Sequence, residues 1–307
     1  MLSRTADSVY WMSRYTERAE NVARLLDVTY RMSLLPTTGV SGYWGAALSA
    51  NGLDEAYQKK YGAFSAPNVV RYMVLDEDNP SSIRTCLRSA RENAHAVRGA
   101  ITSESWETLN ATWLEMRKVT TSQLQGAALS EFFDWVKFRS HLSRGVTFGT
   151  SLRDEAFYFN RLGTFLERAD NTARMLDVKY DPLAPEPSPG NEYYEWGALL
   201  RSVSAFEIYR RVYRDVITPE RVAELLVLRA DMPRSLRACM EEVHATLKII
   251  ANSQSAETER RAGELHAELH FGRIDTILAS GLHEMLTDFL GRTADLGNRI
   301  SADFLVP

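Results

Sequence analysis

Apolar residues recur every three or four positions through most of the chain, which is the period of an amphipathic α-helix. In the first such stretch, Ala19, Ala23, Leu26 and Tyr30 fall on one face of a helix that advances about 100° per residue. Prolines interrupt this periodicity, and the alternating pattern of strands between hairpin turns is absent from the sequence. We therefore expect an all-α fold. The expected helices cover residues 3–34, 43–61, 67–75, 81–99, 103–124, 129–146, 151–180, 192–214, 219–229, 233–252, 256–270 and 272–303.

An internal repeat lies within this helical pattern. Residues 17–30 read ERAENVARLLDVTY and residues 167–180 read ERADNTARMLDVKY, so ten of the fourteen positions are identical. The repeat continues after each copy with a Trp-Gly-Ala triplet at 44–46 and 196–198. Further on, NPSSIRTCL (79–87) matches MPRSLRACM (232–240), which pairs Cys86 with Cys239. A long spacing with a kept order of motifs is typical of a duplicated structural unit.

The repeat predicts how the chain is organised. We expect a helical bundle built of two repeats, residues 1–150 and 151–307, related by a pseudo-twofold axis and fused into one globular unit by the helix 151–180. The proline-rich stretch 181–191 is expected to form an extended surface loop. NPSSI and TPERV are good helix starts, because Ser or Thr can cap the first turn.

The repeated motif carries a polar stripe beside its apolar face. Glu17, Asn21 and Arg24 follow one another at helical spacing, with Arg14 and Arg18 on the flank. The second copy repeats the same residue types, and these residues are Glu167, Asn171 and Arg174, flanked by Arg168. Glu20 and Asp27 lie on a third edge of the first copy. Because a solvated face tolerates any polar residue, we expect the repeated types to be buried or to line a site.

Two interpretations of this stripe remain open. In the structural one, Glu17 pairs with Arg174 or Arg168 of the other repeat, and the loss of one partner of such a buried pair would cost about 3–5 kcal/mol. In the functional one, arginines bind a carboxylate or phosphate and a glutamate moves a proton. A pocket between the repeats would then be composed of both copies.

Other polar clusters are weaker candidates. The segment WVKFRSHLSRGVT (135–147) brings Lys137, Arg139, His141 and Arg144 together and has no counterpart in the second half, so His141 is either a proton shuttle or an ordinary salt-bridged histidine. His266 and His270 have metal-compatible spacing without the H-E-x-x-H pattern, and a structural or surface role is expected. His283 and Glu284 diverge on a helix and do not form a preset dyad. The matched cysteines are expected to be small buried residues.

Composition and charge narrow the function classes. With 307 residues and 45% hydrophobic residues, the chain can bury a large core without disulfides or metals. A net charge of −4 argues against nucleic-acid binding. No secretory leader, membrane-spanning run, phosphate loop, nucleophile elbow or dinucleotide fingerprint is recognisable, so we expect a cytoplasmic protein with no cofactor and no metal site.

The residues also carry a family resemblance. The segments RYTERAENVARLLDVTY, NPSSIRTCLRSARENAHAVRGAI, WVKFRSHLSRGVT, RLGTFLERADNTARMLDVKY and GLHEMLTDFL resemble the bacterial alpha-E domain family, an all-α family with a Glu-Arg signature. The resemblance covers essentially the whole chain and implies that Glu17, Arg18, Glu167 and Arg168 are the signature positions. It also implies partners, because such proteins occur beside circularly permuted ATP-grasp proteins and transglutaminase-like proteins.

This resemblance leads to two functional expectations. The first is an enzyme of an amide- or peptide-bond-forming pathway that acts with an ATP-grasp ligase on a small amino-acid or peptide derivative in a charged pocket between the repeats. The second is a non-catalytic helical partner of the ligase, with the Glu-Arg motifs as buried structural salt bridges. The candidate catalytic residues are Glu17, Glu167 and His141, and the candidate substrate-binding residues are Arg18, Arg168, Asn21, Asn171, Arg24, Arg174 and Arg144.

Overall fold

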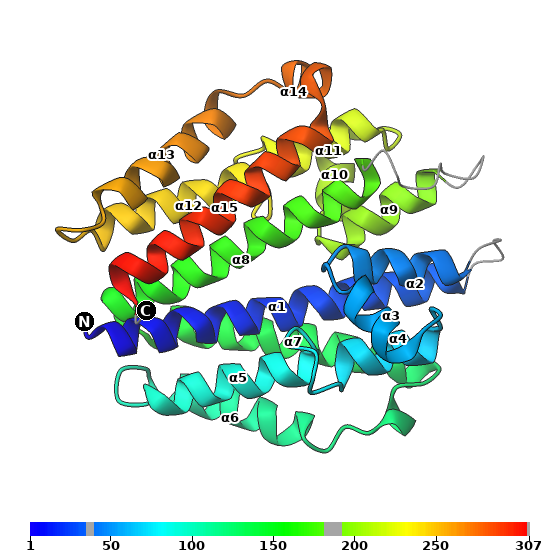
Figure 1. Cartoon of the computed structure of the whole chain (residues 1–307), viewed down its shortest axis with the longest axis horizontal. Helices are drawn as coiled ribbons and strands as arrows, with labels where there is room; N and C mark the ends of the chain where they lie inside the picture. The colour runs from blue at the N-terminus through cyan, green and yellow to red at the C-terminus, as the bar shows by residue number, and fades with distance from the viewer. Residues whose placement is uncertain (35–39, 181–191, 306–307) are drawn as a thin grey trace. The chain divides into compact units, whose positions relative to one another are not determined.

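The computed structural model describes residues 1–34, 40–180 and 192–305 (Figure 1). Every regular element in these three ranges is a helix, which confirms the all-α prediction. Contacts divide the chain into two compact units, Met1–Thr164 (unit 1) and Phe165–Pro307 (unit 2). The division falls inside helix α8 (Glu155–Tyr180), whereas the sequence placed it before that helix. The pseudo-twofold relation of the repeats stays a prediction, and the predicted loop 181–191 lies outside the described residues.

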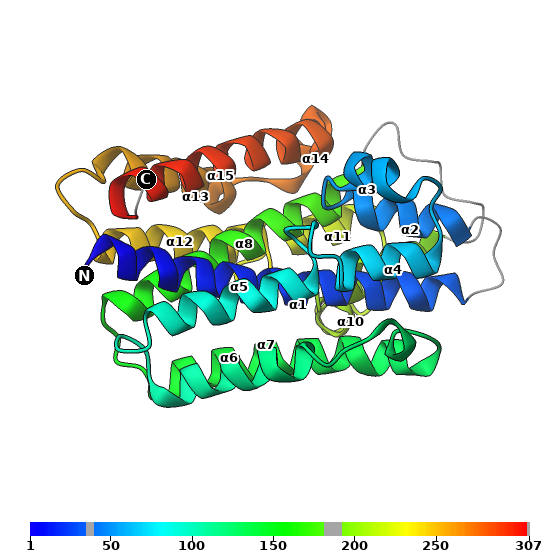
Figure 2. The ribbon, with the colours of Figure 1, turned by 60° about the horizontal axis from the view of Figure 1, so that its bottom comes forward.

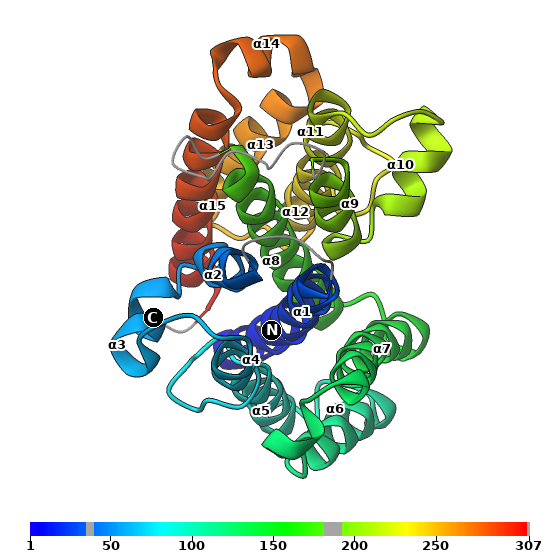
Figure 3. The same ribbon diagram turned by 90° about the vertical axis from the view of Figure 1, so that its right-hand side faces the viewer.

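Unit 1 is built around four helices that pack in a closed ring. Helix α1 (Ser3–Ser33) packs on α5 (Ile83–Ala96), α5 on α6 (Ser103–Met116), α6 on α7 (Ala127–Thr150), and α7 returns to α1. Figure 2 shows α6 and α7 side by side, and Figure 3 views the four helices from one end. This is the arrangement of a four-helix bundle with apolar faces turned inward. The shorter elements of unit 1 are α2 (Val40–Ser49), α3 (Asp54–Tyr61), α4 (Ala66–Val74) and the 3₁₀ turn η1 (Thr121–Gln123).

Unit 2 presents the same order of long and short helices. Helices α9 (Glu192–Ser202), α10 (Phe206–Tyr213) and α11 (Pro219–Val227) take the places that α2, α3 and α4 have in unit 1. Helix α12 (Leu236–Ile249) then packs on α13 (Ala256–Phe271), and α13 packs on α15 (Leu282–Phe304). A short additional helix, α14 (Ile274–Ser280), precedes α15.

Three of the expected helices are broken near residues with a positive φ, and a fourth, 103–124, is α6 followed by the separate turn η1. The expected helix 43–61 is two helices, because Gly52 adopts a positive φ of 64°. The expected helix 192–214 breaks at Ser204, which also has a positive φ, and the expected helix 272–303 breaks at Gly281. The continuous-helix predictions were wrong there because a left-handed residue ends a helix without changing the apolar period of the sequence.

Repeated residues make the same local contacts in both units. The hydroxyl of Ser82 accepts from the N–H of Thr85 and that of Ser235 from the N–H of Ala238, so the predicted helix start at NPSSI and its repeat equivalent are both capped by serine. Thr218 likewise caps α11. The matched thiols of Cys86 and Cys239 are both fully buried, as predicted, and lie 3.8 and 3.9 Å from the carbonyl oxygens of Pro80 and Pro233.

Gly163 marks a close approach between α1 and the part of α8 that belongs to unit 1. A Cβ atom at this position would lie 2.4 Å from the carbonyl oxygen of Tyr10 and 2.2 Å from the hydroxyl oxygen of Ser13. Ser13 stands 150 positions before Gly163, the same offset that relates the two Glu-Arg motifs. The two repeat helices therefore touch at equivalent residues, and only glycine fits on the α8 side.

We expect Gly163→Ala to destabilise the protein by about 1–3 kcal/mol, because the added methyl group would overlap backbone that cannot move independently of α1. Urea denaturation followed by circular dichroism measures this change. Gly291→Ala in α15 is the matched control, because its Cβ would meet no atom within 4 Å, and it should raise or leave unchanged the denaturation midpoint. Equal midpoints for Gly163→Ala and wild type would contradict the close approach.

Candidate functional site

Two carboxylates of the first motif are withdrawn from water inside unit 1. The side chain of Glu17 is 1% exposed and that of Glu20 is 0% exposed. Both belong to α1, one turn apart, on the side that faces α7. Burying an ionised carboxylate is unfavourable unless cations and hydrogen-bond donors compensate it. The residues that face Glu17 and Glu20 therefore decide what this part of the molecule can do.

Helix α7 supplies this compensation from a single turn. One guanidinium nitrogen of Arg144, Nη1, lies 2.8 Å from Oε2 of Glu17 and 2.5 Å from Oε2 of Glu20. It also donates to the hydroxyl of Ser140 at 2.9 Å, and that hydroxyl donates to Glu20 at 2.8 Å. Arg144 thus bridges both carboxylates and ties α7 to α1.

The solvent side of this cluster is closed by Arg24 and His141. Arg24 donates from Nε to Oε1 of Glu20 at 2.8 Å. The exposed ring of His141 lies between two guanidinium groups, with Nε2 3.1 Å from Arg24 and Nδ1 2.7 Å from Arg144. A guanidinium group only donates, and a neutral imidazole accepts at one nitrogen, so at most one of these contacts is a hydrogen bond to a ring lone pair. We refer to Glu17, Glu20, Arg24, Ser140, His141 and Arg144 as the α1–α7 network.

A second set of ion pairs joins the same two helices at Asp27. Lys137 of α7 lies 2.8 Å from Oδ2 of Asp27, and Arg31 lies 3.0 Å from Oδ1. The hydroxyl of Ser130 also reaches this carboxylate, at 3.3 Å. Basic residues of α7 therefore meet acidic residues of α1 at two places, Lys137 at Asp27 and Arg144 at Glu17 and Glu20.

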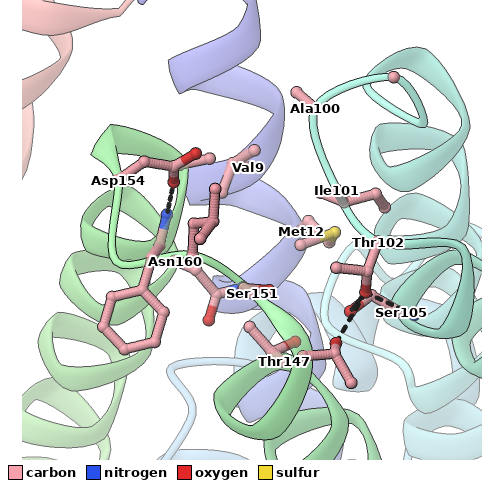
Figure 4. A pocket seen from close by; sticks show the side chains of 15 residues that line it. Val9, Met12, Ala100, Ile101, Thr102, Ser105, Thr147, Ser151, Asp154 and Asn160 are labelled. Carbon is pink, nitrogen blue, oxygen red and sulfur yellow. Dashed lines mark hydrogen bonds between the residues drawn. The ribbon is translucent and has the colours of Figure 1, made fainter.

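Two cavities lie next to the network in unit 1. The one lined by Glu17 and Arg144 has a volume of about 10 Å³, which is the space of a single water molecule. A larger cavity of about 220 Å³ shares Met12, Thr147 and Asn160 with it (Figure 4). Its polar lining consists of Thr102, Ser105, Thr147, Thr150, Ser151, Asp154 and Asn160.

The larger cavity has little charge of its own. Asp154 is its charged lining residue, and one of its carboxylate oxygens accepts from the N–H of Phe157 at 3.1 Å, which caps the first turn of α8. The hydroxyls of Thr102 and Thr150 are 2.9 Å apart on its wall. The cavity can therefore offer hydroxyl and amide hydrogen bonds to a small molecule, with no arginine in its lining.

The second motif has a different environment. Glu167 is 4% exposed and Arg168 is 8% exposed, whereas Asn171 is half-buried and the side chain of Arg174 is 41% exposed. The prediction that the repeated polar stripe is buried is therefore confirmed at Glu167 and not along the whole second copy. Arg168 donates to the carbonyl of Pro233 at 3.4 Å and lies over the ring of Phe165. Arg174 pairs with Asp170 at 2.8 Å, as Arg24 pairs with Glu20 in the first copy.

Helix α15 approaches the second motif as α7 approaches the first. Nδ1 of His283 lies 2.7 Å from Asp177, which is the repeat equivalent of Asp27. The residues that α7 and α15 present differ seven positions further along each helix. Seven residues after Lys137 comes Arg144, whereas seven residues after His283 comes Leu290. In this register, the position on α15 that corresponds to Arg144 is therefore a leucine.

The structure brings together four of the candidate site residues, Glu17, Arg24, His141 and Arg144. Of the other candidates, Asn21 is buried on α1, Asn171 is half-buried on α8, and Arg18 lies with its guanidinium over the ring of Tyr15. The expected meeting of Glu17 with Glu167 stays a prediction. Sequence reasoning missed the roles of Glu20 and Ser140, although Glu20 stands at helical spacing from both Glu17 and Arg24.

Three histidines of unit 2, His244, His266 and His270, lie ring against ring. The rings of His244 and His266 are 5.4 Å apart and nearly parallel, and His270 lies 5.4 Å from His266 on the other side. Nδ1 of His244 and Nε2 of His266 are buried without a hydrogen-bond partner. Burial lowers the pKa of both imidazoles, and the neighbouring histidine lowers each further. Among the described residues, no group of three or more acidic, histidine or cysteine side chains is placed to hold a metal ion.

The family of the chain follows from its sequence as a whole. A model of the alpha-E domain, a predicted α-helical domain with a conserved ER motif, matches residues 1–305. The chain belongs to the alpha-E family. That the Glu-Arg pairs at 17–18 and 167–168 are the conserved motif of this family stays a prediction, because the sequence also has Glu-Arg pairs at 220–221 and 259–260. In the described part of this alpha-E chain, every helix is too short or too polar to cross a membrane.

Known relatives are longer proteins without an assigned activity. Uncharacterized proteins of Mycobacterium bovis and of two Mycobacterium tuberculosis strains are 27% identical to this alpha-E chain over 314 residues, which covers 94% of it. The matched region is 35% of each relative, so the chain spans about a third of their length. No solved structure matches the chain.

The α1–α7 network predicts a large effect of removing its shared cation. We expect Arg144→Met to destabilise the protein by about 3–5 kcal/mol at pH 7.5, because two buried carboxylates lose their common partner. Acidification towards pH 5 should return part of this loss, since protonation removes the repulsion between them. Urea denaturation at both pH values measures the effect. The exposed Arg260→Met is the control and should change little. A loss that stays constant with pH would contradict the shared role of Arg144.

The histidine stack predicts a loss of stability in mild acid. The unfolded chain binds protons at the ordinary histidine pKa of about 6.5, whereas the folded chain binds them less readily at His244 and His266. The contribution of these two imidazoles to the free energy of unfolding is therefore fully present above that pH and decreases as the pH drops below it. Urea midpoints at pH 8, 6.5 and 5.5 should show this fall, and His244→Leu should flatten it. An equally steep fall in the variant would assign the effect to other groups.

Proposed function

We propose that this alpha-E chain is a non-catalytic helical partner of an amide- or peptide-bond-forming ligase, and that its first Glu-Arg motif braces unit 1. The observation that carries the proposal is that Arg144 pairs at once with Glu17 and Glu20 beside a cavity of about 10 Å³. A catalytic glutamate must reach the proton that it moves, and this cavity has no room for a substrate. The motif is therefore better explained as a support than as a reaction centre.

The charge of the network supports the same conclusion. Its two carboxylates, Glu17 and Glu20, are balanced by the guanidinium groups of Arg24 and Arg144, each of which already has a carboxylate partner. An arginine that grips a substrate carboxylate would have to exchange this partner for the ligand. Such an exchange would leave a buried carboxylate uncompensated, which is costly.

The partner follows from the family and from the length of its members. The resemblance of the motifs implies neighbouring circularly permuted ATP-grasp proteins, with transglutaminase-like proteins as further partners. In the mycobacterial relatives, the matched region is joined to further chain that makes up about two thirds of the protein. A domain that is covalently attached to a larger protein in its relatives fits a role exercised together with that protein.

Reconstitution with the ligase tests the proposal. The ligase is incubated with ATP and an amino-acid pool, with wild-type chain, with Glu17→Gln or without the chain, and products are identified by mass spectrometry. We expect Glu17→Gln to lower the urea midpoint of the chain, and we expect the same products in the same ratio at a temperature where the variant is folded. Binding to the ligase, measured by calorimetry, should be unchanged at that temperature. A fully folded Glu17→Gln chain that binds the ligase but abolishes one product would contradict the bracing role.

An enzymatic role is the second candidate, and the larger cavity favours it. Its volume of about 220 Å³ and its hydroxyl and amide lining suit a small amino-acid derivative, and it shares Thr147 and Asn160 with the small cavity that Glu17 and Arg144 line. Asn160→Leu would fill the cavity without touching an ion pair of the network. If the chain acts on a substrate there, this variant should lose the product while it keeps its urea midpoint. The same products with both chains would leave the partner role as the better account.

A further inference from the structure

The outer side of α7 carries apolar side chains in water. Phe138 is 65% exposed and Leu142 is 36% exposed, and Leu152, just past the end of the helix, is 81% exposed. Phe138 and Leu142 stand one helical turn apart on the side opposite Ser140, which faces α1. Exposed apolar residues gathered on one helix face are typical of a surface that contacts a partner.

Two glycines continue this face within the helix. Gly145 and Gly149 follow Phe138 and Leu142 at helical spacing, and a Cβ atom at either glycine would meet nothing within 4 Å. Glycine is the least favourable residue in a helix interior apart from proline. Within the described chain, no close approach requires glycine at these positions. A helix that approaches from outside would require it, because glycines let two helix backbones come close.

We propose that this face binds the same face of a second copy of the chain in an antiparallel helix pair. With the twofold axis between Ser143 and Arg144, Phe138 of one copy lies opposite Gly149 of the other, and Leu142 lies opposite Gly145. Each large side chain then meets the space left by a glycine. Such an interface is isologous, since the contact of each pair occurs twice about the axis.

The charges at the two ends of the face select this orientation. Asp134 is 62% exposed on the same stripe, one turn before Phe138, and one of its carboxylate oxygens lies 2.6 Å from Lys137 of its own helix. Arg153 is exposed just after the helix ends. The same axis places Asp134 of one copy opposite Arg153 of the other. A parallel pair would instead set Phe138 against Phe138, glycine against glycine, and the two Asp134 carboxylates side by side.

Sedimentation velocity over a wide concentration range tests the pairing. We expect the wild-type chain to show a monomer–dimer equilibrium with a dissociation constant in the micromolar range, as for small interfaces. Gly145→Gln combined with Gly149→Gln should weaken association at least tenfold, because the larger side chains keep the helices apart. Gly291→Gln is the matched control, since Gly291 is also an open glycine within a helix, and it should leave association unchanged.

Disulfide cross-linking tests the register. Phe138→Cys combined with Gly149→Cys should give a covalent dimer under mild oxidation. Phe138→Cys alone should give no covalent dimer, because the two introduced thiols lie far apart along the helix pair. The wild-type chain, whose two cysteines Cys86 and Cys239 are buried, gives the background level of cross-linking under the same oxidation. A wild-type chain that is monomeric at all concentrations would overturn the proposal. A dimer that is insensitive to the two glycine changes, or that cross-links through Phe138→Cys alone, would overturn it as well.

Discussion

The burial of Glu17 and Glu20 constrains the rest of unit 1. Two carboxylates one turn apart cannot both leave water unless a cation reaches them together, and Arg144 is that cation. A slip of α7 by one turn would move Arg144 about 5.4 Å along α1, so that Glu17 and Glu20 would lose the cation they share and Glu20 would keep its pair with Arg24. Buried ion pairs are weak evidence for net stability, because apolar replacements are often as stable. Their contribution here is to fix the register of α7 on α1, and the pairing of Lys137 with Asp27 fixes the same register a second time.

The two copies of the motif keep their own internal pairs and differ in what faces them. Arg24 pairs with Glu20 and Arg174 with Asp170 one turn apart, so this part of the motif is satisfied within a single helix. The facing helix then distinguishes the copies: α7 brings Arg144, whereas α15 brings His283 to Asp177 and has Leu290 where the arginine would stand. A duplicated motif therefore does not carry a duplicated environment. The near-identity of the two segments in sequence conceals this difference.

Sequence periodicity was sufficient for the fold class and for the long helices, because an apolar stripe of fixed period specifies a helix wherever it is packed. It was not sufficient for the breaks at Gly52, Ser204 and Gly281, which depend on the backbone conformation of single residues. For the site, the repeated polar types indicated that Glu17 and Glu167 are buried, and this was confirmed. The partner of Glu17 within unit 1 was not identified, although Arg144 had been singled out by its position in a segment unique to the first half. Which residue of α7 faces Glu17 depends on how two helices pack, and the period of either helix alone does not contain that information.

The polarity of the C-terminal half of α7 is reversed relative to an ordinary surface helix, and this connects the ion network to the outer face. Ser140 and Arg144 turn towards α1, whereas Phe138 and Leu142 turn towards solvent. The carboxylates of α1 explain the inner side, because Glu17 and Glu20 require a hydroxyl and a guanidinium there, but they do not require apolar residues on the outer side. Apolar surface left in water costs about 25 cal/mol per Å² relative to burial. The chain could have avoided this cost with polar residues at positions 138 and 142, as it does at the exposed Glu131 and Asp134 of the same helix. That it carries a phenylalanine, a leucine and two glycines instead is explained when the outer face is itself a packing surface.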